Sequence, residues 1–401
     1  MISKSYLRLK PITLMRATTR SISSYDDVPS KVVLNKDFMK DEQGNYLVTL
    51  LKGHGIGPEI SRSVKQIFQA AGVPITWEEH EVYSRAMNKE GDLLSSETIN
   101  SIRRNKVALK GPFMTPIGKG FRSLNVTLRK KLQLYANVRP CRTIKGIDNI
   151  YDNVDLVTIR ENTEGEYMGL EHRVVPGVSE SIKIISRRAC LKIARYAFEY
   201  AIRNNRKRII GVHKAGVMKK GDGLFLECLR EINEEYPTIQ YSEKQVDTMC
   251  MKLAMNPQDC DMMVMPNLYG DIVSDLCAGL IGGLGLTASG NIGAEAAVFE
   301  AVHGTAPDIA GKNLANPTAL LLSGCMMLDH MELYDHGNTI RNAIYNTIEE
   351  RDNLTRDLKG AGSTTLFTEA VIKRIENKTD PEAKEYSFAE SKDTKIDEAP
   401  Q

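Results

Sequence analysis

The feature of this sequence that most restricts its fold is an alternation of short apolar runs with helical patterns. Residues 46–53 (YLVTLLKG) read as a strand that ends at glycine, and residues 58–72 place apolar side chains at helical spacing after a proline. Further strand-like runs and a further helical pattern follow at 154–161, 186–202, 208–214 and 261–267. This alternation predicts an α/β protein with a largely parallel sheet, in which ligand-binding groups collect at strand ends.

Composition excludes several classes of protein. The 401 residues carry 53 Lys and Arg against 51 Asp and Glu, so no basic excess indicates a nucleic-acid partner. A basic helix face (Arg187, Arg188, Lys192, Arg195, Arg203) has the spacing of a solvated surface. No apolar run approaches the ~18 residues of a membrane span. The seven cysteines are scattered without a C-x-x-C pair, which indicates buried thiols in a reducing compartment.

The two ends of the chain differ from the rest. Residues 1–25 are rich in Arg, Lys and Ser and contain no acid, which is typical of a mitochondrial presequence and predicts the mitochondrial matrix. A disordered basic tail is the alternative. Residues 378–401 are polar and predict a flexible C-terminal tail.

Two local motifs remain ambiguous when read alone. The segment GHGIGPEI (53–60) joins a strand to a helix but lacks G-x-G-x-x-G spacing, so it is either a tight turn or a phosphate-binding loop. Asp271 and Asp275 share one helix face inside an apolar segment. Either one caps the helix while the other forms a salt bridge, or both hold Mg²⁺ or Mn²⁺ through hard oxygens.

The segment that contains these aspartates, NLYGDIVSDLCAGLIGGLGLTASGNIG (267–293), resembles the signature of the decarboxylating β-hydroxyacid dehydrogenases. These are the isocitrate, isopropylmalate, homoisocitrate and tartrate enzymes, and the resemblance extends from about Val48 to Ile375. It implies that Asp271 and Asp275 bind the metal, with Asp247 donated by the partner subunit.

The resemblance also implies a fold and a division into domains. The expected fold is the three-layer α/β fold of the isopropylmalate/isocitrate dehydrogenases, which is not a Rossmann fold. A large domain would comprise residues 45–134 and 282–377, and a small domain residues 135–281. A clasp near 168–184 would join two subunits.

For substrate binding, the resemblance points to a set of cationic and short polar side chains: Lys110, Ser123, Asn125, Arg129, Arg139 and Arg160. In isocitrate enzymes the Ser and Asn of an RSLN stretch contact the γ-carboxylate, whereas isopropylmalate enzymes place aliphatic residues there. Short polar residues can hydrogen-bond a carboxylate and cannot favour an apolar tail, so isocitrate is the expected substrate.

The same resemblance assigns proton transfer and the cofactor. Lys214, from the neighbouring subunit, would help to deprotonate the substrate hydroxyl, and Tyr167 would protonate the enolate left by decarboxylation. Asp308 can accept hydrogen bonds from the ribose of NAD and would repel the 2′-phosphate of NADP. Relatives that use NADP carry Lys-Tyr at the positions of Asp308 and Ile309. The implied cofactor residues are Thr115, His303, Gly304, Ala306, Asp308, Ile309 and Asn316.

Two positions depart from the family pattern: His54 stands where Asp is usual, and Gly216 replaces an Asn. The resemblance is closest to the hetero-oligomeric NAD-dependent isocitrate dehydrogenases. It implies a catalytic-type subunit with a regulatory partner subunit. A homoisocitrate or isopropylmalate dehydrogenase, or a non-catalytic regulatory subunit, remain the alternatives.

Overall fold

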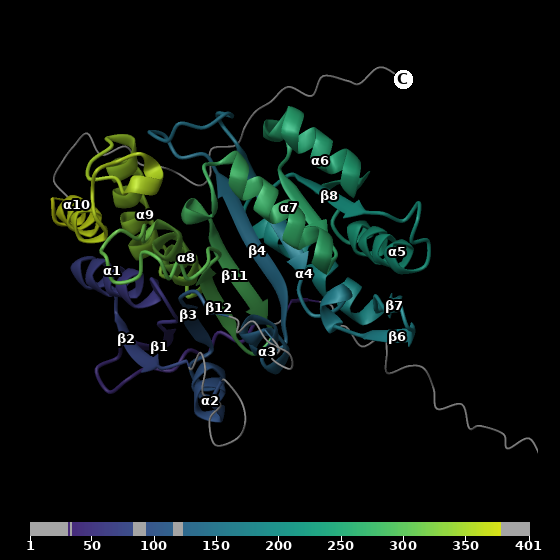
Figure 1. Cartoon of the computed structure of the whole chain (residues 1–401), viewed down its shortest axis with the longest axis horizontal. Coiled ribbons are helices and arrows are strands. Elements are labelled where there is room, and N and C mark those ends of the chain that lie inside the picture. Colours follow the sequence, from purple (N-terminus) through teal and green to yellow (C-terminus); the bar gives the residue numbers. More distant parts are fainter. Residues whose placement is uncertain (1–30, 33, 83–93, 115–122, 378–401) are drawn as a thin grey trace, which may run out of the picture.

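The computed structural model describes residues 31–32, 34–82, 94–114 and 123–377 (Figure 1). The predicted presequence, the predicted C-terminal tail and Thr115 lie outside the described residues. Strands and helices alternate along most of the described chain, as the sequence predicts.

The strands are β1 (Tyr46–Leu51), β2 (Ile75–His80), β3 (Val107–Lys110), β4 (Leu134–Arg142), β5 (Asp155–Glu161), β6 (Glu171–Val175), β7 (Val178–Ser181), β8 (Arg208–His213), β9 (Gln240–Gln245), β10 (Met262–Met265), β11 (Ala288–Gly293) and β12 (Ala297–Ala301). The α-helices are α1 (Gly57–Ala70), α2 (Ser96–Asn105), α3 (Leu124–Lys131), α4 (Arg187–Arg203), α5 (Gly221–Glu234), α6 (Val246–Met255), α7 (Asn267–Leu280), α8 (Thr318–His330), α9 (Tyr334–Glu349) and α10 (Thr364–Glu376).

A ten-stranded sheet in the order β2-β1-β3-β12-β11-β4-β5-β10-β8-β9 forms the middle of the molecule. The strands towards both edges of the sheet, β2-β1-β3-β12 and β5-β10-β8-β9, pair in parallel, which confirms the prediction of a largely parallel sheet. Its centre differs, because β12, β11, β4 and β5 pair antiparallel. Antiparallel neighbours with polar residues at matching positions allow side chains from four strands to meet at one place.

Helices cover both faces of this sheet, and alternate residues of single strands show it. In β10, Met262 and Val264 belong to the apolar cluster that includes α4, while Met263 and Met265 belong to the cluster that includes α6 and α7. Because successive side chains of a strand point to opposite faces, α4 and α7 lie on opposite sides. The result is a three-layer α/β fold, as expected.

The first helix shows how closely local sequence sets local structure. Pro58 stands in the first turn of α1, where its missing N–H leaves no helical hydrogen bond unmade. Ile60, Val64 and Ile67 are buried at helical spacing against the sheet. The predicted helix at 58–72 is therefore confirmed, with its ends shifted by one or two residues.

The two segments assigned to one large domain meet in the sheet. β3, from the first segment, pairs with β12, from the second, with Leu109 opposite Phe299. The sheet continues without a break through β11 and β4 into the strands of the middle segment. The domain boundaries near 134 and 281 stay predictions.

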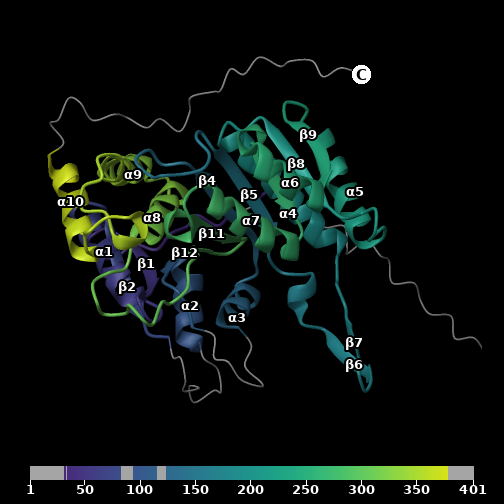
Figure 2. The same ribbon diagram turned by 45° about the horizontal axis from the view of Figure 1, so that its top comes forward.

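A β-hairpin formed by β6 and β7 projects away from the rest of the structure (Figure 2). Every residue of its two strands is exposed, including Val174, Val175 and Val178. It occupies the segment in which a subunit clasp is expected. An isolated two-stranded hairpin is marginal in water, so an exposed one with apolar side chains is suited to pairing with another chain.

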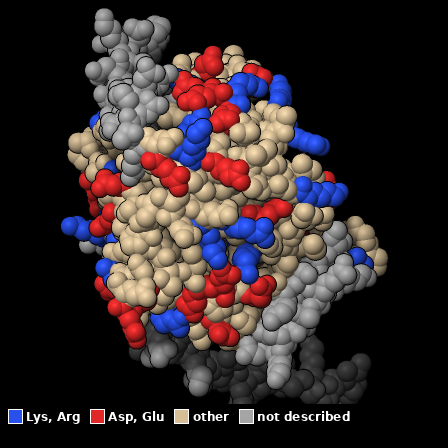
Figure 3. All heavy atoms as spheres, turned by 90° about the vertical axis from the view of Figure 1, so that its left-hand side faces the viewer, with Lys and Arg blue, Asp and Glu red and all other residues tan. Residues whose placement is uncertain are grey.

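The surface carries intermixed charge. Acidic and basic side chains are interspersed on the face seen in Figure 3. On the basic face of α4, the side chain of Arg187 is 40% exposed and lies 2.5 Å from Glu231, as a solvated surface predicts. Arg195 is buried and lies 2.6 Å from Glu235, so the prediction of a solvated side chain is wrong at this position. No helix in the described parts of the chain is long and apolar enough to cross a membrane.

Candidate active site

The two aspartates lie in the second and third turns of α7, the helix that follows the buried strand β10. Asp271 and Asp275 are four residues apart and therefore share one helix face, as predicted. Their side chains are 35% and 53% exposed, so both carboxylates reach solvent although most of the helix is buried. Each carboxylate lies beside an arginine of the sheet.

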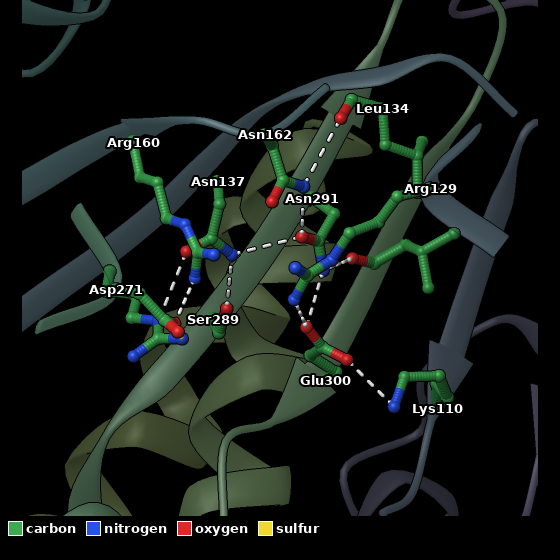
Figure 4. Close-up of polar contacts among 12 residues, drawn as sticks. Lys110, Arg129, Leu134, Asn137, Arg160, Asn162, Asp271, Ser289, Asn291 and Glu300 are labelled. Atoms are coloured by element: carbon green, nitrogen blue, oxygen red, sulfur yellow. Dashed lines mark hydrogen bonds and ion pairs between the residues drawn. The ribbon is translucent and has the colours of Figure 1, made fainter. Parts of the chain in front are cut away.

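Arg160, on β5, pairs with Asp271. Its Nη1 donates to Asp271 (Figure 4). Its Nε and Nη2 donate to Asn267 Oδ1 at 3.0 and 2.8 Å. Asn267 is fixed in turn, because its Nδ2 donates to the carbonyl of Glu164 at 2.7 Å. The Arg160 guanidinium is almost fully buried, which lowers its pKa, while the charge on Asp271 opposes that shift. The side chain is therefore held in one orientation.

Gly270 explains how α7 can approach Arg160 so closely. A Cβ atom at this position would lie 2.4 Å from Cγ and 2.6 Å from Cβ of Arg160. Such distances are far inside van der Waals contact, so a side chain here would displace the arginine. A glycine immediately before Asp271 is therefore a steric requirement of the site.

Arg139, on β4, pairs with the second aspartate. Its Nη1 donates to Asp275 Oδ1 at 2.6 Å and to Ser274 Oγ at 2.7 Å, and its Nε donates to Asn137 Oδ1 at 3.1 Å. Both aspartates therefore form salt bridges. Within one chain, ion pairing alone accounts for two carboxylates in this apolar segment, and neither caps the helix.

Tyr167 lies on the short helical turn Glu166–Met168 and meets the same group. Its hydroxyl donates to Asp271, and its ring centroid is 5.0 Å from the Arg160 guanidinium. Burial, followed by the hydrogen bond to the Asp271 carboxylate, raises the pKa of this phenol above its ordinary value. The tyrosine is thus a neutral proton donor beside a cation and a carboxylate.

A second cationic group lies where β3 and β12 end. Lys110 Nζ is 2.8 Å from Glu300 Oε2, and Arg129 is 3.7 Å from the other oxygen of that carboxylate. Asn291 Nδ2 also donates to Glu300 at 2.7 Å. Burial favours the neutral acid, but the positive charges of Lys110 and Arg129 outweigh it and lower the pKa of Glu300 to about 2. Glu300 is the buried counter-ion of two predicted substrate residues.

Asn291 connects the two cationic groups. Its Oδ1 accepts hydrogen bonds from Asn137 at 3.1 Å and from Asn162 at 3.0 Å (Figure 4). Asn137 accepts in turn from Arg139. A buried chain of hydrogen bonds therefore runs from Lys110 through the central strands to Arg139. Buried networks of this kind rigidify the groups that they join, although Asn162 Oδ1 has no hydrogen-bond partner among the described residues.

These groups border a cavity of about 160 Å³. Its lining residues include Lys110, Asn125, Arg129, Arg139, Glu300, His303 and Gly304. Asn125 Oδ1 is buried, and no hydrogen-bond partner for it is found in the described parts of the chain. Ser123 immediately precedes α3, six residues before Arg129. The structure thus places four of the six predicted substrate residues, Lys110, Asn125, Arg129 and Arg139, in the lining of this cavity. Arg160 lies near it through Asp271, which Arg139 also approaches.

Lys214 and Asp247 lie apart from this group. Lys214 Nζ donates to Asp247 Oδ2 at 2.7 Å, and Asp247 is 63% exposed on α6. Among the described residues, no three His, Cys, Asp or Glu side chains are arranged to hold a metal ion. One chain by itself therefore does not assemble the three predicted aspartates. Lys214 and Asp247 would have to lie away from their own chain's aspartates if they are donated to another subunit, and they do.

Asp271 and Asp275 nevertheless suit a divalent cation. They offer exposed carboxylate oxygens on one helix face, and oxygen ligands are those that Mg²⁺ and Mn²⁺ prefer. Arg160 and Arg139 now neutralise them. The residues fit a hard cation whose remaining ligands would have to be supplied by other groups, because the described part of one chain offers only these two carboxylates on this face.

The predicted cofactor residues follow β12 on one loop. Asp308 is exposed, Ile309 is half-buried beside it, and Ala306 has a positive φ of 37°. His303 Nδ1 is 3.0 Å from the Gly304 carbonyl, and burial lowers the pKa of this imidazole. Asn316 Nδ2 donates to Asp357 at 2.9 Å. His303 and Gly304 of this loop line the cavity, and Asp357 is an acidic neighbour of Asn316 that the sequence did not indicate.

The GHGIGP segment packs against this loop. A Cβ at Gly55 would lie 1.9 Å from the carbonyl oxygen of Thr305, so only glycine fits. His54 accepts a hydrogen bond from the Met114 amide through Nδ1 at 3.0 Å, and its Nε2 is 3.0 Å from the Val82 carbonyl. Because Nδ1 accepts, Nε2 carries the proton. This histidine joins two backbone segments, whereas Gly216 leaves open space around it, with Gln245 atoms 3.9 Å from an added Cβ.

Sequence reasoning missed Asn267, Gly270, Asn291 and Glu300. An acid inside the apolar strand AVFEA was a usable signal for Glu300, since a buried carboxylate requires a partner. Nothing local indicated the other three. Fold and site together define an α/β enzyme with a cationic cavity for a small polyanion.

Comparison with known proteins identifies the family. The isocitrate/isopropylmalate dehydrogenase family model matches residues 47–375. The chain therefore belongs to the isocitrate/isopropylmalate dehydrogenase family.

Individual relatives agree with this assignment. The chain is 60% identical over 328 residues to the mitochondrial NAD isocitrate dehydrogenase catalytic subunit 5 of Arabidopsis thaliana, covering 82% of this chain and 88% of that protein. It is 59% identical over 326 residues to the chloroplastic 3-isopropylmalate dehydrogenase of Solanum tuberosum, covering 80% and 91%. The crystal structure of isocitrate dehydrogenase from Methylococcus capsulatus superposes with a TM-score of 0.78 at 47% identity, covering 82% of this chain and 99% of that one.

Proposed function

We propose that this chain catalyses the NAD-dependent oxidative decarboxylation of isocitrate to 2-oxoglutarate and CO₂. The observation that carries the proposal is the convergence of Arg139, Arg160 and Tyr167 on the aspartates of α7. The names of relatives above 50% identity support the same reaction.

The choice of isocitrate over isopropylmalate rests on the wall of the cavity formed by α3. Asn125 lines it with a carboxamide, and Arg129 lies one helical turn further on. An apolar isopropyl group would leave these polar groups unpaired, which costs about 1–3 kcal/mol for each group. A third carboxylate can accept hydrogen bonds from the carboxamide N–H groups of Asn125 and from the Arg129 guanidinium. This argument favours isocitrate although one close relative is named for isopropylmalate.

The arginines would hold the substrate's carboxylates. Arg139 and Arg160 now donate to Asp275 and Asp271, so binding requires an exchange of partners. The guanidiniums would turn to the incoming carboxylates, and the aspartates would turn to a divalent cation. NAD would accept the hydride, and Mg²⁺ or Mn²⁺ would lower the pKa of the substrate hydroxyl and stabilise the enolate.

Proton transfer would use two residues of different chains. Lys214 of the neighbouring subunit would accept the hydroxyl proton as the hydride leaves. After CO₂ is lost, Tyr167 would give its phenolic proton to the enolate carbon, a role that suits its raised pKa. Asp247 would reach the cation together with Lys214, since the two side chains are in contact.

These roles require at least two chains. The exposed β6–β7 hairpin would be the clasp that joins them. The partner would be a regulatory subunit of the same family, in a mitochondrial hetero-oligomer located in the matrix. The Arg- and Ser-rich first 25 residues and the name of the Arabidopsis relative support this location.

NADH absorbance tests the function directly. We expect turnover with isocitrate, NAD and Mn²⁺, and loss of turnover with EDTA or when NADP replaces NAD. The assay is run on this chain alone and on the chain co-expressed with a regulatory subunit. Turnover with isopropylmalate or homoisocitrate in place of isocitrate would reassign the substrate. Absence of turnover with all three acids in both preparations would indicate a regulatory role.

Replacing Gly270 tests the placement of Arg160. In Gly270→Ala the new methyl group must displace Arg160, so one charged hydrogen bond to the substrate should be lost. We expect KM for isocitrate to rise roughly 10- to 100-fold. Gly279→Ala is the control, because Gly279 is exposed on the same helix and no described atom lies within 4 Å of an added Cβ. The control should keep KM and stabilise the helix by about 0.5–1 kcal/mol. An unchanged KM in Gly270→Ala would contradict the role of Arg160.

A further inference from the structure

Lys183 occupies an enclosed position between the two predicted proton-transfer residues. It follows β7 on the segment that returns from the hairpin, and its side chain is only 15% exposed. Its Nζ lies 2.9 Å from Asp222 Oδ1 and 3.5 Å from Glu166 Oε1. The Tyr269 hydroxyl is 3.5 Å away, and the Tyr269 ring centroid is 4.5 Å away. A lysine with these partners is a structural cation and not a solvated one.

Asp222 links this lysine to Lys214. The Asp222 side chain is fully buried in the first turn of α5, and its Oδ2 accepts the backbone N–H of Lys214 at 2.7 Å. The turn from Lys214 to Met218 is closed by the Met218 amide, which donates to the Lys214 carbonyl at 2.9 Å. Asp222 thereby fixes the backbone of Lys214 and leaves its Nζ directed to Asp247.

The same returning segment holds Tyr167. The Gly165 amide donates to the Ile184 carbonyl at 2.9 Å, and the Ser186 amide donates to Glu164 at 2.8 Å. Glu166, the neighbour of Tyr167, is the second carboxylate beside Lys183. Residues 183–186 therefore contact both the turn that carries Tyr167 and the buried Asp222, which holds the Lys214–Met218 turn.

We propose that Lys183 is a positioning residue that ties the hairpin to both Tyr167 and Lys214. The inference rests on the proposed function. If Lys214 serves the neighbouring site while Tyr167 serves its own, the Lys183–Asp222 pair connects the proton donor of one site with the proton acceptor of the next. Subunit pairing through the hairpin would then set the geometry of both sites. Removing Lys183 would leave the buried charge of Asp222 uncompensated, so the turn from Lys214 to Met218 should become less stable.

Hydrogen exchange followed by mass spectrometry tests this on the full-length chain in its assembled form. In Lys183→Met we expect the amides of Lys214 and Met218 to exchange roughly tenfold faster or more, while those of α9 stay unchanged. Lys183→Arg should keep slow exchange, because a guanidinium can also reach Asp222. Lys373→Met, at an exposed lysine of α10, is the matched control and should change neither region. Unchanged exchange at 214–218, or equal acceleration in α9, would overturn the proposal.

Kinetics separate this proposal from the proposed function. In Lys183→Met we expect kcat to fall roughly 10- to 100-fold through misplacement of the transfer groups, with KM for isocitrate nearly unchanged and with recovery in Lys183→Arg. Faster exchange with an unchanged kcat would overturn the positioning role. If the unmodified protein does not oxidise isocitrate, the proposed function fails, and the exchange result alone decides whether Lys183 fixes the loop.

Discussion

Glu300→Gln should lower the free energy of unfolding by about 3–5 kcal/mol, the cost of leaving a buried ion without its partner. Glu300 lies 2.8 Å from Lys110 and also faces Arg129, and the side chains of Lys110 and Glu300 are almost fully buried. Glutamine keeps the shape and removes the charge, so two cations would remain without a counter-ion. Urea unfolding at neutral pH measures the change. Glu369→Gln, at an exposed site on α10, should change stability by less than about 0.5 kcal/mol.

The pH dependence of this difference provides a second test. The folded-state pKa of Glu300, about 2, is lower than its ordinary value of 4.5. Its ionised form therefore stabilises the fold fully above pH 4.5, and this contribution is lost as the pH falls through about 2. The stability difference between the unmodified protein and Glu300→Gln should shrink over that window. A difference that stays constant down to the acid limit of the fold would show that Glu300 does not act through its charge.

Tyr167→Phe should reduce kcat roughly 10²- to 10⁴-fold, the usual contribution of a positioned general acid. The phenyl ring can keep its stacking beneath Arg160, so KM for isocitrate should change little. The NADH assay measures both constants. Tyr334→Phe, at a tyrosine that is 54% exposed, is the matched control and should behave like the unmodified enzyme.

Because Tyr167 also donates a hydrogen bond to Asp271, the kinetic experiment needs one further measurement, at raised Mn²⁺ concentration. If the hydroxyl served only to orient that aspartate toward a cation, a higher Mn²⁺ concentration would restore activity to Tyr167→Phe. We expect no restoration, because the missing proton cannot be replaced by cation binding. Recovery at saturating Mn²⁺ would assign the tyrosine to Asp271 and not to proton transfer.

The hydrogen-bonded centre of the sheet gives these predictions a common basis. Asn291 contacts Glu300 on one side and Asn137 on the other, so the Lys110 and Arg139 groups share one buried network. The antiparallel pairing of β11 with β4 places Asn291 opposite Asn137. Changes at either cationic group should therefore affect the other, as is general for groups joined in one network.

Local patterns in the sequence determined the classes of element and part of the site. Strand and helix periods depend only on near neighbours, so the α/β class with a largely parallel sheet and the shared face of Asp271 and Asp275 follow directly. The resemblance to the family added the three-layer architecture, the arginines, Tyr167 and Lys214. Read alone, the two aspartates were compatible with ion pairs or with a metal, and the resemblance predicted a metal. The structure supplies the ion pairs, and the metal remains part of the proposed function.

Tertiary structure alone decided which distant residues meet. Asn137 and Asn291 are 154 positions apart, and Lys183 and Asp222 are 39 apart. Periodicity does not encode strand order or the direction of pairing, so the antiparallel centre, the buried counter-ion Glu300 and the steric need for Gly270 could not be read from it. Contacts of this kind arise because packing the sheet brings together polar groups that must be satisfied once they leave water.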